Sequence, residues 1–140
     1  MARTFRIGVI GYSAQAFDEN DARLILRRAL EGHALAGRCE VVSGLTNLGV
    51  PRIAYEEAVK LGLRTVGIAC KKATEHECFP CDEVVIIGEE WGDESPTFLA
   101  SIDVLIRVGG GKQSASEYEA FTGPKRYYPL DALSTGQPTS

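Results

Sequence analysis

The sequence predicts a three-layer α/β fold in which a mostly parallel β-sheet carries helices on both faces. Two observations lead to this prediction. Short, β-branched apolar segments alternate along the chain with longer segments in which apolar residues recur at helical spacing. The strand-like segments also lack the polar–apolar alternation of half-exposed strands, as expected for strands buried on both faces of a parallel sheet.

The first predicted strand covers residues 5–11 and ends in glycine. Residues 18–20 then offer N-caps for a helix, because Ala22 begins an apolar stripe at helical spacing. A second strand is predicted over residues 39–42. These three elements form the first strand–helix–strand unit of the sheet.

A second unit follows with the same pattern. Pro51 is suited to the first position of a helix, where its missing N–H has no cost. Along this helix, Glu56 and Lys60 have the i,i+4 spacing of an exposed ion pair. The third strand is predicted over residues 65–69.

The remaining elements are shorter. Strands are predicted over residues 83–87, 102–108 and 126–129. Between them, Ser95 caps a short helix that ends near residue 101, and residues 114–121 form the last helix. The chain therefore offers six strands and four helices for the sheet and its two covering layers.

Composition and charge exclude several kinds of partner. The chain has 140 residues, of which 44% are apolar and 24% charged, and 15 basic against 19 acidic residues give a net charge of −4. An acidic chain is not expected to bind nucleic acid, and its apolar runs are too short to span a membrane. We expect a cytoplasmic protein with one domain over residues 1–133 and a polar, flexible tail over residues 134–140.

Three glycine-containing loops follow predicted strands, and ligands of open α/β sheets bind at such strand ends. In the first loop, Gly11 permits a sharp turn, Tyr12 can stack on a flat ring, and Ser13 can donate a hydrogen bond to a phosphate. The loop lacks the G-x-G-x-x-G dinucleotide fingerprint. A tight turn without a ligand is the alternative interpretation.

The second loop leads from a strand into a helix. Its candidate ligand contacts are Gly44, Thr46, Asn47 and Gly49. The N-terminus of the following helix is expected to direct free N–H groups and its positive dipole end into the crevice. Thr46 and Asn47 are equally well explained as turn residues.

The third loop carries the strongest signal. Three consecutive glycines follow a buried strand, where they cost conformational entropy and add no side-chain packing. Glycines are favoured there only if the backbone needs positive φ or must approach a ligand closely. The candidate phosphate-binding residues are Gly109, Gly110, Gly111, Lys112, Gln113 and Ser114. Ser114 and Glu117 have the spacing of a capping box. Alternatively, Glu117 contacts a ribose or acts in acid–base chemistry.

The order of these motifs resembles the Rossmann-like family historically labelled "possible lysine decarboxylase". The family includes the LONELY GUY phosphoribohydrolases and molybdenum-cofactor carrier-like proteins. Its P-G-G-x-G-T-x-x-E loop follows a strand that begins with aspartate, here Asp103. Gly110, Gly111 and Glu117 match the loop, Ser114 replaces threonine, Gly109 replaces proline, and Gln113 replaces the third glycine. The resemblance extends over residues 5–121 and implies a Rossmann-like fold and a homodimer or higher homo-oligomer.

The chain departs from the phosphoribohydrolase members of this family. They place an arginine about nine residues before the strand's aspartate, whereas this chain has no arginine from residue 65 to 106. Eight acidic residues and no Lys or Arg lie between Glu75 and Glu94. We expect most of them on a solvated rim. If Asp93 or Glu94 faces the crevice, a ribose hydroxyl, a cationic ligand or Mg²⁺ is favoured there.

The favoured interpretation is a small protein that binds a nucleotide or a nucleotide-derived phosphate ligand without the family's full hydrolase activity. One alternative is a phosphoribohydrolase that cleaves the N-glycosidic bond of a nucleoside monophosphate, with Glu117 as its catalytic carboxylate. Another is an oligomeric adaptor. No cofactor is firmly implied beyond a bound nucleotide or phosphate.

A cysteine and histidine cluster gives a weaker signal. Cys70, His76, Cys78 and Cys81 lie within twelve positions, and such residues can hold zinc. The C-x-x-C step lacks the context of a redox motif. Ordinary loop and core cysteines are the favoured reading, with zinc and redox roles as alternatives. Trp91 is expected either to cover an adenine ring or to anchor its loop.

Overall fold

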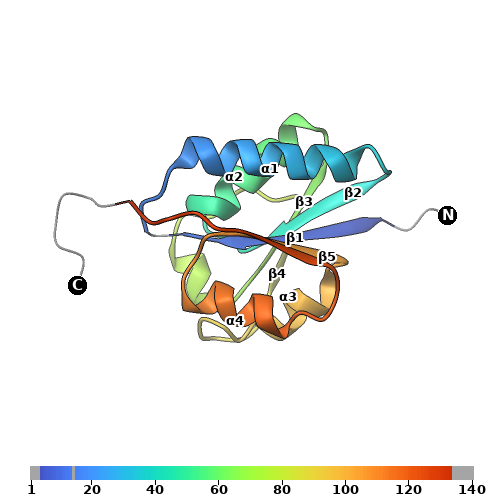
Figure 1. Cartoon of the computed structure of the whole chain (residues 1–140). Coiled ribbons are helices and arrows are strands. Elements are labelled where there is room, and N and C mark those ends of the chain that lie inside the picture. The colour runs from blue at the N-terminus through green and yellow to red at the C-terminus, as the bar shows by residue number, and fades with distance from the viewer. Residues whose placement is uncertain (1–3, 14, 134–140) are drawn as a thin grey trace.

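The computed structural model describes residues 4–13 and 15–133, which form three layers (Figure 1). The expected tail at residues 134–140 lies outside this range. The described strands are β1 (Phe5–Gly11), β2 (Cys39–Ser43), β3 (Arg64–Ala69), β4 (Glu83–Ile86), β5 (Val104–Val108) and β6 (Lys125–Tyr128). The described helices are α1 (Glu19–Ala34), α2 (Gly49–Lys60), α3 (Ser95–Ser101), α4 (Lys112–Ala120) and the short 3₁₀ helix η1 (Lys71–Glu75).

These strands form one sheet in the order β4-β3-β2-β1-β5-β6, with every neighbouring pair parallel. Helices α1 and α2 cover one face and α3 and α4 cover the other (Figure 1). The three-layer prediction is confirmed. In a parallel sheet all carboxyl ends meet at one edge, so the loops that follow β1, β2 and β5 come together there.

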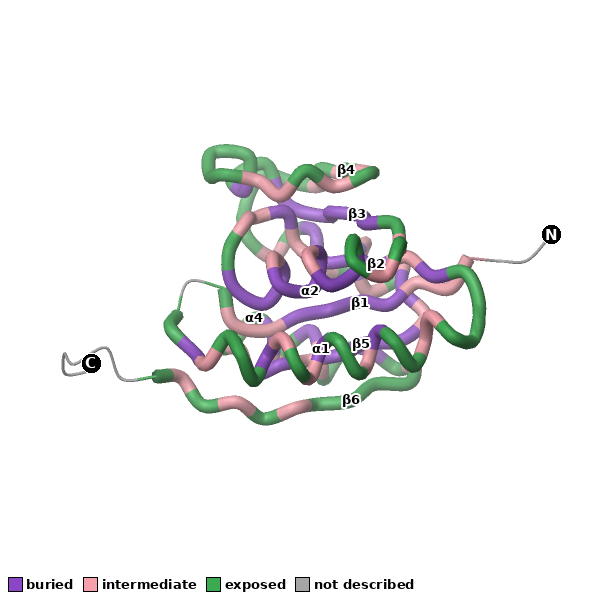
Figure 2. The backbone as a smooth tube through the Cα atoms, turned by 90° about the horizontal axis from the view of Figure 1, so that it is seen from above, coloured by how far each residue is buried: buried purple, intermediate pink, exposed green. Residues whose placement is uncertain are grey.

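The core lies on both sides of the central strands, which are buried, whereas the edge strands β4 and β6 are exposed (Figure 2). On the α1 and α2 side, Ile7 and Val41 of the sheet pack with Leu26 and Ile53. On the other side, Phe98 of α3 packs with sheet residues such as Val42 and Leu105. Burial on both faces explains why the central strands lack alternation in the sequence.

Two helices begin earlier than predicted. Helix α2 starts at Gly49, so Pro51 is its third residue, still in the first turn where proline is tolerated. Helix α4 starts at Lys112, and Gly111 precedes it as the N-cap residue. Ser114 therefore lies inside the helix and cannot form the predicted capping box. The 3₁₀ helix η1 carries no periodic apolar pattern and was not expected.

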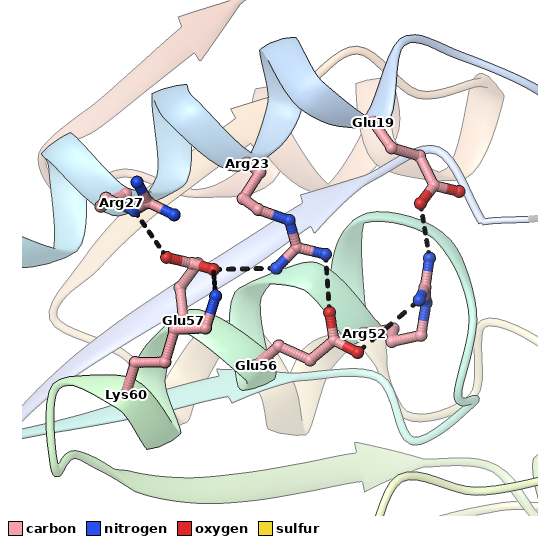
Figure 3. Close-up of polar contacts among 7 residues, drawn as sticks. All are labelled: Glu19, Arg23, Arg27, Arg52, Glu56, Glu57 and Lys60. Atoms are coloured by element: carbon pink, nitrogen blue, oxygen red, sulfur yellow. Dashed lines mark hydrogen bonds and ion pairs between the residues drawn. The ribbon is translucent and has the colours of Figure 1, made fainter.

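The predicted pair between Glu56 and Lys60 is wrong. Lys60 instead donates to Glu57 at 3.0 Å, because the Glu57 side chain turns toward α1 and becomes buried. There its carboxylate also accepts from Arg23 at 2.8 Å and from Arg27 at 2.9 Å (Figure 3). One buried carboxylate thus holds α2 against α1 through Arg23 and Arg27, while Lys60 pairs with it within α2.

The neighbouring contacts extend this network along the two helices (Figure 3). Glu56 accepts from Arg23 at 2.7 Å, and Arg52 donates to Glu19 at 2.7 Å. Burial by itself would raise the pKa of Glu57, but the hydrogen bonds from Arg27, Arg23 and Lys60 lower it from 4.5 to about 2. The folded state therefore favours the charged form of this carboxylate.

The lowered pKa of Glu57 predicts a specific loss of stability in acid. Its contribution is complete above pH 4.5 and disappears as the pH falls from 4.5 toward 2, because the unfolded chain takes up the proton first. Glu57→Gln should lower the free energy of unfolding by about 2 kcal/mol at pH 7. In urea denaturation, the difference between the two proteins should shrink toward pH 2.

Glu56→Gln is the matched control for this measurement. The Glu56 side chain is 34% exposed, so its removal should cost less than about 1 kcal/mol. A Glu57→Gln difference that stays constant from pH 7 to pH 2 would contradict the assignment.

Candidate functional site

A cavity of about 410 Å³ opens at the carboxyl ends of β1, β2 and β3. The first turn of α4 and the start of α3 complete its wall. Ten of the predicted site residues line it: Gly11, Tyr12, Ser13, Gly44, Thr46, Gly111, Lys112, Gln113, Ser114 and Glu117. Asn47, Gly49, Gly109 and Gly110 are not among the lining residues. The structure thus brings parts of all three predicted loops to one site.

The loop after β1 is packed between the other two. The Tyr12 carbonyl accepts a hydrogen bond from the Val50 N–H at 2.7 Å. The Tyr12 ring stacks on Phe17 with centroids 5.6 Å apart, and Gly109 lies against the same ring. Tyr12 therefore has a structural role in joining the loops, although it also borders the cavity.

Three of the predicted glycines serve this packing rather than lining the cavity. Gly49 has φ +67°, and a Cβ atom there would collide with the Tyr12 carbonyl oxygen. Gly110 has φ +99°, and a Cβ atom would lie 2.6 Å from Ser114 Oγ. Gly109 has φ +60° beside the Tyr12 ring. The backbone needs both positive φ and close approach at these positions.

Two of the first three residues of α2 offer no free N–H group to a ligand. The Val50 N–H is taken by Tyr12, and Pro51 has none. Asn47 is also engaged elsewhere. Its main-chain N–H donates to Glu77 O at 2.9 Å and its side chain donates to the Glu77 carboxylate at 2.6 Å. Asn47 thus fastens the segment before β4 to the second loop.

The N-terminus of α4 is different. Its N-cap residue Gly111 makes no side-chain cap hydrogen bond, and Lys112, Gln113 and Ser114 of the first turn all line the cavity. Ser114 Oγ lies 3.4 Å from the Gly11 carbonyl oxygen, which it can donate to. The first turn of a nine-residue helix therefore borders the cavity with its positive dipole end.

Glu117 lies one turn further along α4, in the cavity wall. It is 8% exposed, and Ser95 Oγ donates to its Oε2 at 2.7 Å. Burial raises the pKa of Glu117, the hydrogen bonds with Ser95 and Gln113 lower it, and the charge of Glu94 raises it, with a net increase. Glu117 therefore binds Ser95 instead of capping its own helix.

Residues from the segment after β4 also line the cavity, and Trp91 and Glu94 are the most important of them. Glu94 is 6% exposed, and its carboxylate accepts from the Gly92 N–H at 2.9 Å. Most of the acidic residues between 75 and 94 are exposed, as expected for a solvated rim. The acidic cluster was the only signal that pointed to Glu94. Gln15 and Phe98 also line the cavity, and no sequence motif had pointed to either residue.

The cysteine and histidine cluster does not converge. Cys70 is buried, and burial raises the pKa of Cys81 to about 11. The Cys78 thiol lies 3.4 Å from the His76 carbonyl oxygen. Within residues 4–13 and 15–133, no group of three or more His, Cys, Asp or Glu side chains is arranged to hold a metal ion. Across the same residues, no helix has the length and apolar content to cross a membrane.

The close packing at Gly49 predicts a large cost for a small substitution. Gly49→Ala should lower the free energy of unfolding by about 2 kcal/mol or more, because the new Cβ meets the Tyr12 main chain at positive φ. Gly44 lies in the same loop, but its Cβ position is open. Gly44→Ala should therefore change stability by less than about 1 kcal/mol in the same urea denaturation series. Equal effects would contradict the packing argument.

The contact between Ser95 and Glu117 predicts a measurable pKa change. The Ser95 hydroxyl stabilises the charged carboxylate, so Ser95→Ala should raise the pKa of Glu117 above its value in the parent protein. Carboxyl ¹³C NMR titration reports this pKa directly. Ser101→Ala is the control, because Ser101 Oγ donates to Phe98 O on the same helix. An unchanged or lower pKa in Ser95→Ala would show that the contact is absent in solution.

Comparison with known proteins bears on the fold. No protein-family model and no curated protein sequence matches the chain. Among solved structures, the molybdenum cofactor carrier protein of Chlamydomonas reinhardtii is similar, with a TM-score of 0.73 and 23% identity over 89% of this chain and 76% of that one. A second similar structure is the molybdenum cofactor binding protein of the phototrophic bacterium Rippkaea orientalis. Its TM-score is 0.73, with 27% identity over 91% of this chain and 77% of that one.

A third similar structure is that of a protein designated TM1055. It has a TM-score of 0.66 and 24% identity over 86% of this chain and 77% of that one. The three agree in fold with the family resemblance derived from the loop motifs. The chain thus has a Rossmann-like fold of the kind found in molybdenum cofactor carrier proteins.

Proposed function

We propose that the chain binds a phosphorylated small molecule with a planar ring system, in the cavity at the carboxyl edge of the sheet. The observation that carries this proposal is the first turn of α4. Gly111, Lys112 and Gln113 line the cavity there, and the helix start has no side-chain cap. Main-chain N–H groups, the helix dipole and one lysine together are the usual elements of a phosphate site.

The rest of the cavity is suited to the planar ring system of the proposed ligand. Leu45, Ile68 and Phe98 supply a buried apolar wall, and Thr46 adds a polar group at its edge. Pockets for small ligands commonly combine a mostly apolar lining with a few polar groups that set orientation. A cavity of about 410 Å³ lies within the usual range of ligand pockets, about 300–1,000 Å³.

The molybdenum cofactor belongs to the proposed ligand class, since it contains a phosphorylated pterin. The similarity to the Rippkaea orientalis molybdenum cofactor binding protein supports this choice. The lining residues fit its phosphate and ring parts, and among the described residues around this cavity there is no Cys or His to ligate a metal. We therefore propose a carrier or binding protein that holds its ligand through the phosphate and the ring.

A hydrolase that cleaves an N-glycosidic bond is the second candidate, and the environment of Glu117 favours it. A buried carboxyl with a raised pKa beside a ligand cavity can act as a general acid or base. Release of free base from AMP, abolished in Glu117→Gln, would identify this activity. The absence of base release at high protein concentration would exclude the hydrolase and leave binding as the remaining function.

Thermal-shift titration tests the binding function. AMP, GMP and the molybdenum cofactor released from a molybdoenzyme are the probes. A ligand at a hundred times its Kd adds about 2.7 kcal/mol, which should raise Tm by several degrees in a domain of this size. Lys112→Glu should abolish the shift, because it places a negative charge at the start of α4.

Arg28→Glu is the control, because it makes the same charge change on the exposed surface of α1 and lines neither cavity. A shift that survives Lys112→Glu would place the phosphate elsewhere. The absence of a shift with all three probes would overturn the proposed function.

A further inference from the structure

A second cavity lies between α3 and α4 and adjoins the first. Its volume is about 680 Å³, within the usual range of ligand pockets. Trp91, Lys112, Gln113 and Glu117 line both cavities. A ligand seated in the first cavity can therefore extend across these shared residues into the second.

The second cavity has an apolar wall of its own. Pro96 and Leu99 of α3 and Ala120 of α4 line it, together with the ring of Trp91. Pro96, Leu99 and Ala120 do not line the first cavity, whereas Trp91, from the loop before α3, borders both. Aromatic and aliphatic walls bind planar rings by stacking and by burial of apolar surface, and they tolerate different ring types.

Trp91 is 50% exposed, and its ring packs against the ring of His76 with centroids 5.9 Å apart. The Asp93 carboxylate accepts from the N–H groups of Glu89 at 3.0 Å and Glu90 at 2.9 Å. These contacts order the backbone of the loop that carries Trp91. An ordered backbone at this position lowers the entropic cost of binding a ring there.

The border between the two cavities carries groups suited to a phosphate. Lys112 supplies a positive charge and Gln113 an amide donor, both from the first turn of α4. Building on the function proposed above, we infer that the site is bipartite. It takes a dinucleotide-type ligand, in which a phosphate or pyrophosphate joins one ring in the first cavity to a second planar ring that stacks on Trp91.

The test compares AMP with diadenosine diphosphate, which adds a second phosphate and nucleoside. Trp91 is the only tryptophan of the chain, so its fluorescence reports binding at this border. Diadenosine diphosphate should bind at least about tenfold more tightly than AMP, the gain expected from stacking one more base. Ser116→Met should remove that gain and leave the Kd of AMP unchanged, because Ser116 lines only the second cavity.

Glu119→Met is the matched control, since Glu119 is exposed on the same helix and lines neither cavity. Equal affinity for the two probes, or a gain that survives Ser116→Met, would overturn the bipartite site while leaving the proposed function intact. A failure of both probes to bind would overturn the bipartite site, and the proposed function would fall with it only if GMP and the molybdenum cofactor also give no thermal shift. A dimer in light scattering that Ser116→Met converts to a monomer would show that a second copy covers this cavity, and would also overturn the inference.

Discussion

The arrangement of the site depends on how the loop after β1 packs against the other two loops. Its Tyr12 carbonyl accepts the Val50 N–H, and Gly49 lies against the same main chain. Gly109 lies against the Tyr12 ring on the other side. A larger residue at either glycine would push α2 or α4 away from β1, and the strand ends would no longer enclose one cavity. Gly49 and Gly109, which the sequence suggested as ligand contacts, act instead by allowing this approach.

Two buried carboxylates have different pKa values and different roles because their neighbouring groups differ. Glu57 is surrounded by three cations, which lower its pKa to about 2 and keep it charged between α1 and α2. Glu117 has a serine hydroxyl and the nearby Glu94 in place of cations, and its pKa is raised. The first therefore stabilises the packing of two helices, whereas the second keeps its proton to a higher pH than an ordinary glutamate.

The distribution of charge is compatible with an anionic ligand despite the net charge of −4. Most acidic residues between 75 and 94 project into solvent, where water and salt screen them. The first turn of α4 borders the cavity with its positive end. The polar part of the site thus lies on the first turn of α4, and an apolar part lies on α3 and the segment around Trp91.

The sequence by itself determined the order and the type of the elements. The apolar run from Phe5 to Gly11 and the capping by Asp18 are local features, and both are found where they were predicted. Parallel pairing also follows, since strand–helix alternation leaves few other arrangements. The third loop was predicted as a ligand site from local sequence as well, because consecutive glycines after a buried strand are costly unless the backbone requires them.

Only the tertiary structure decided which side chains meet. Glu57 was one of several glutamates on a helical pattern until the packing of α2 on α1 buried it beside Arg23 and Arg27. Asn47 was predicted as a ligand contact but pairs with Glu77. Trp91 lines the same cavity as Gly11, although the two residues lie far apart in the sequence. Such contacts depend on the relative placement of elements far apart in the chain, and local propensity carries no information about that placement.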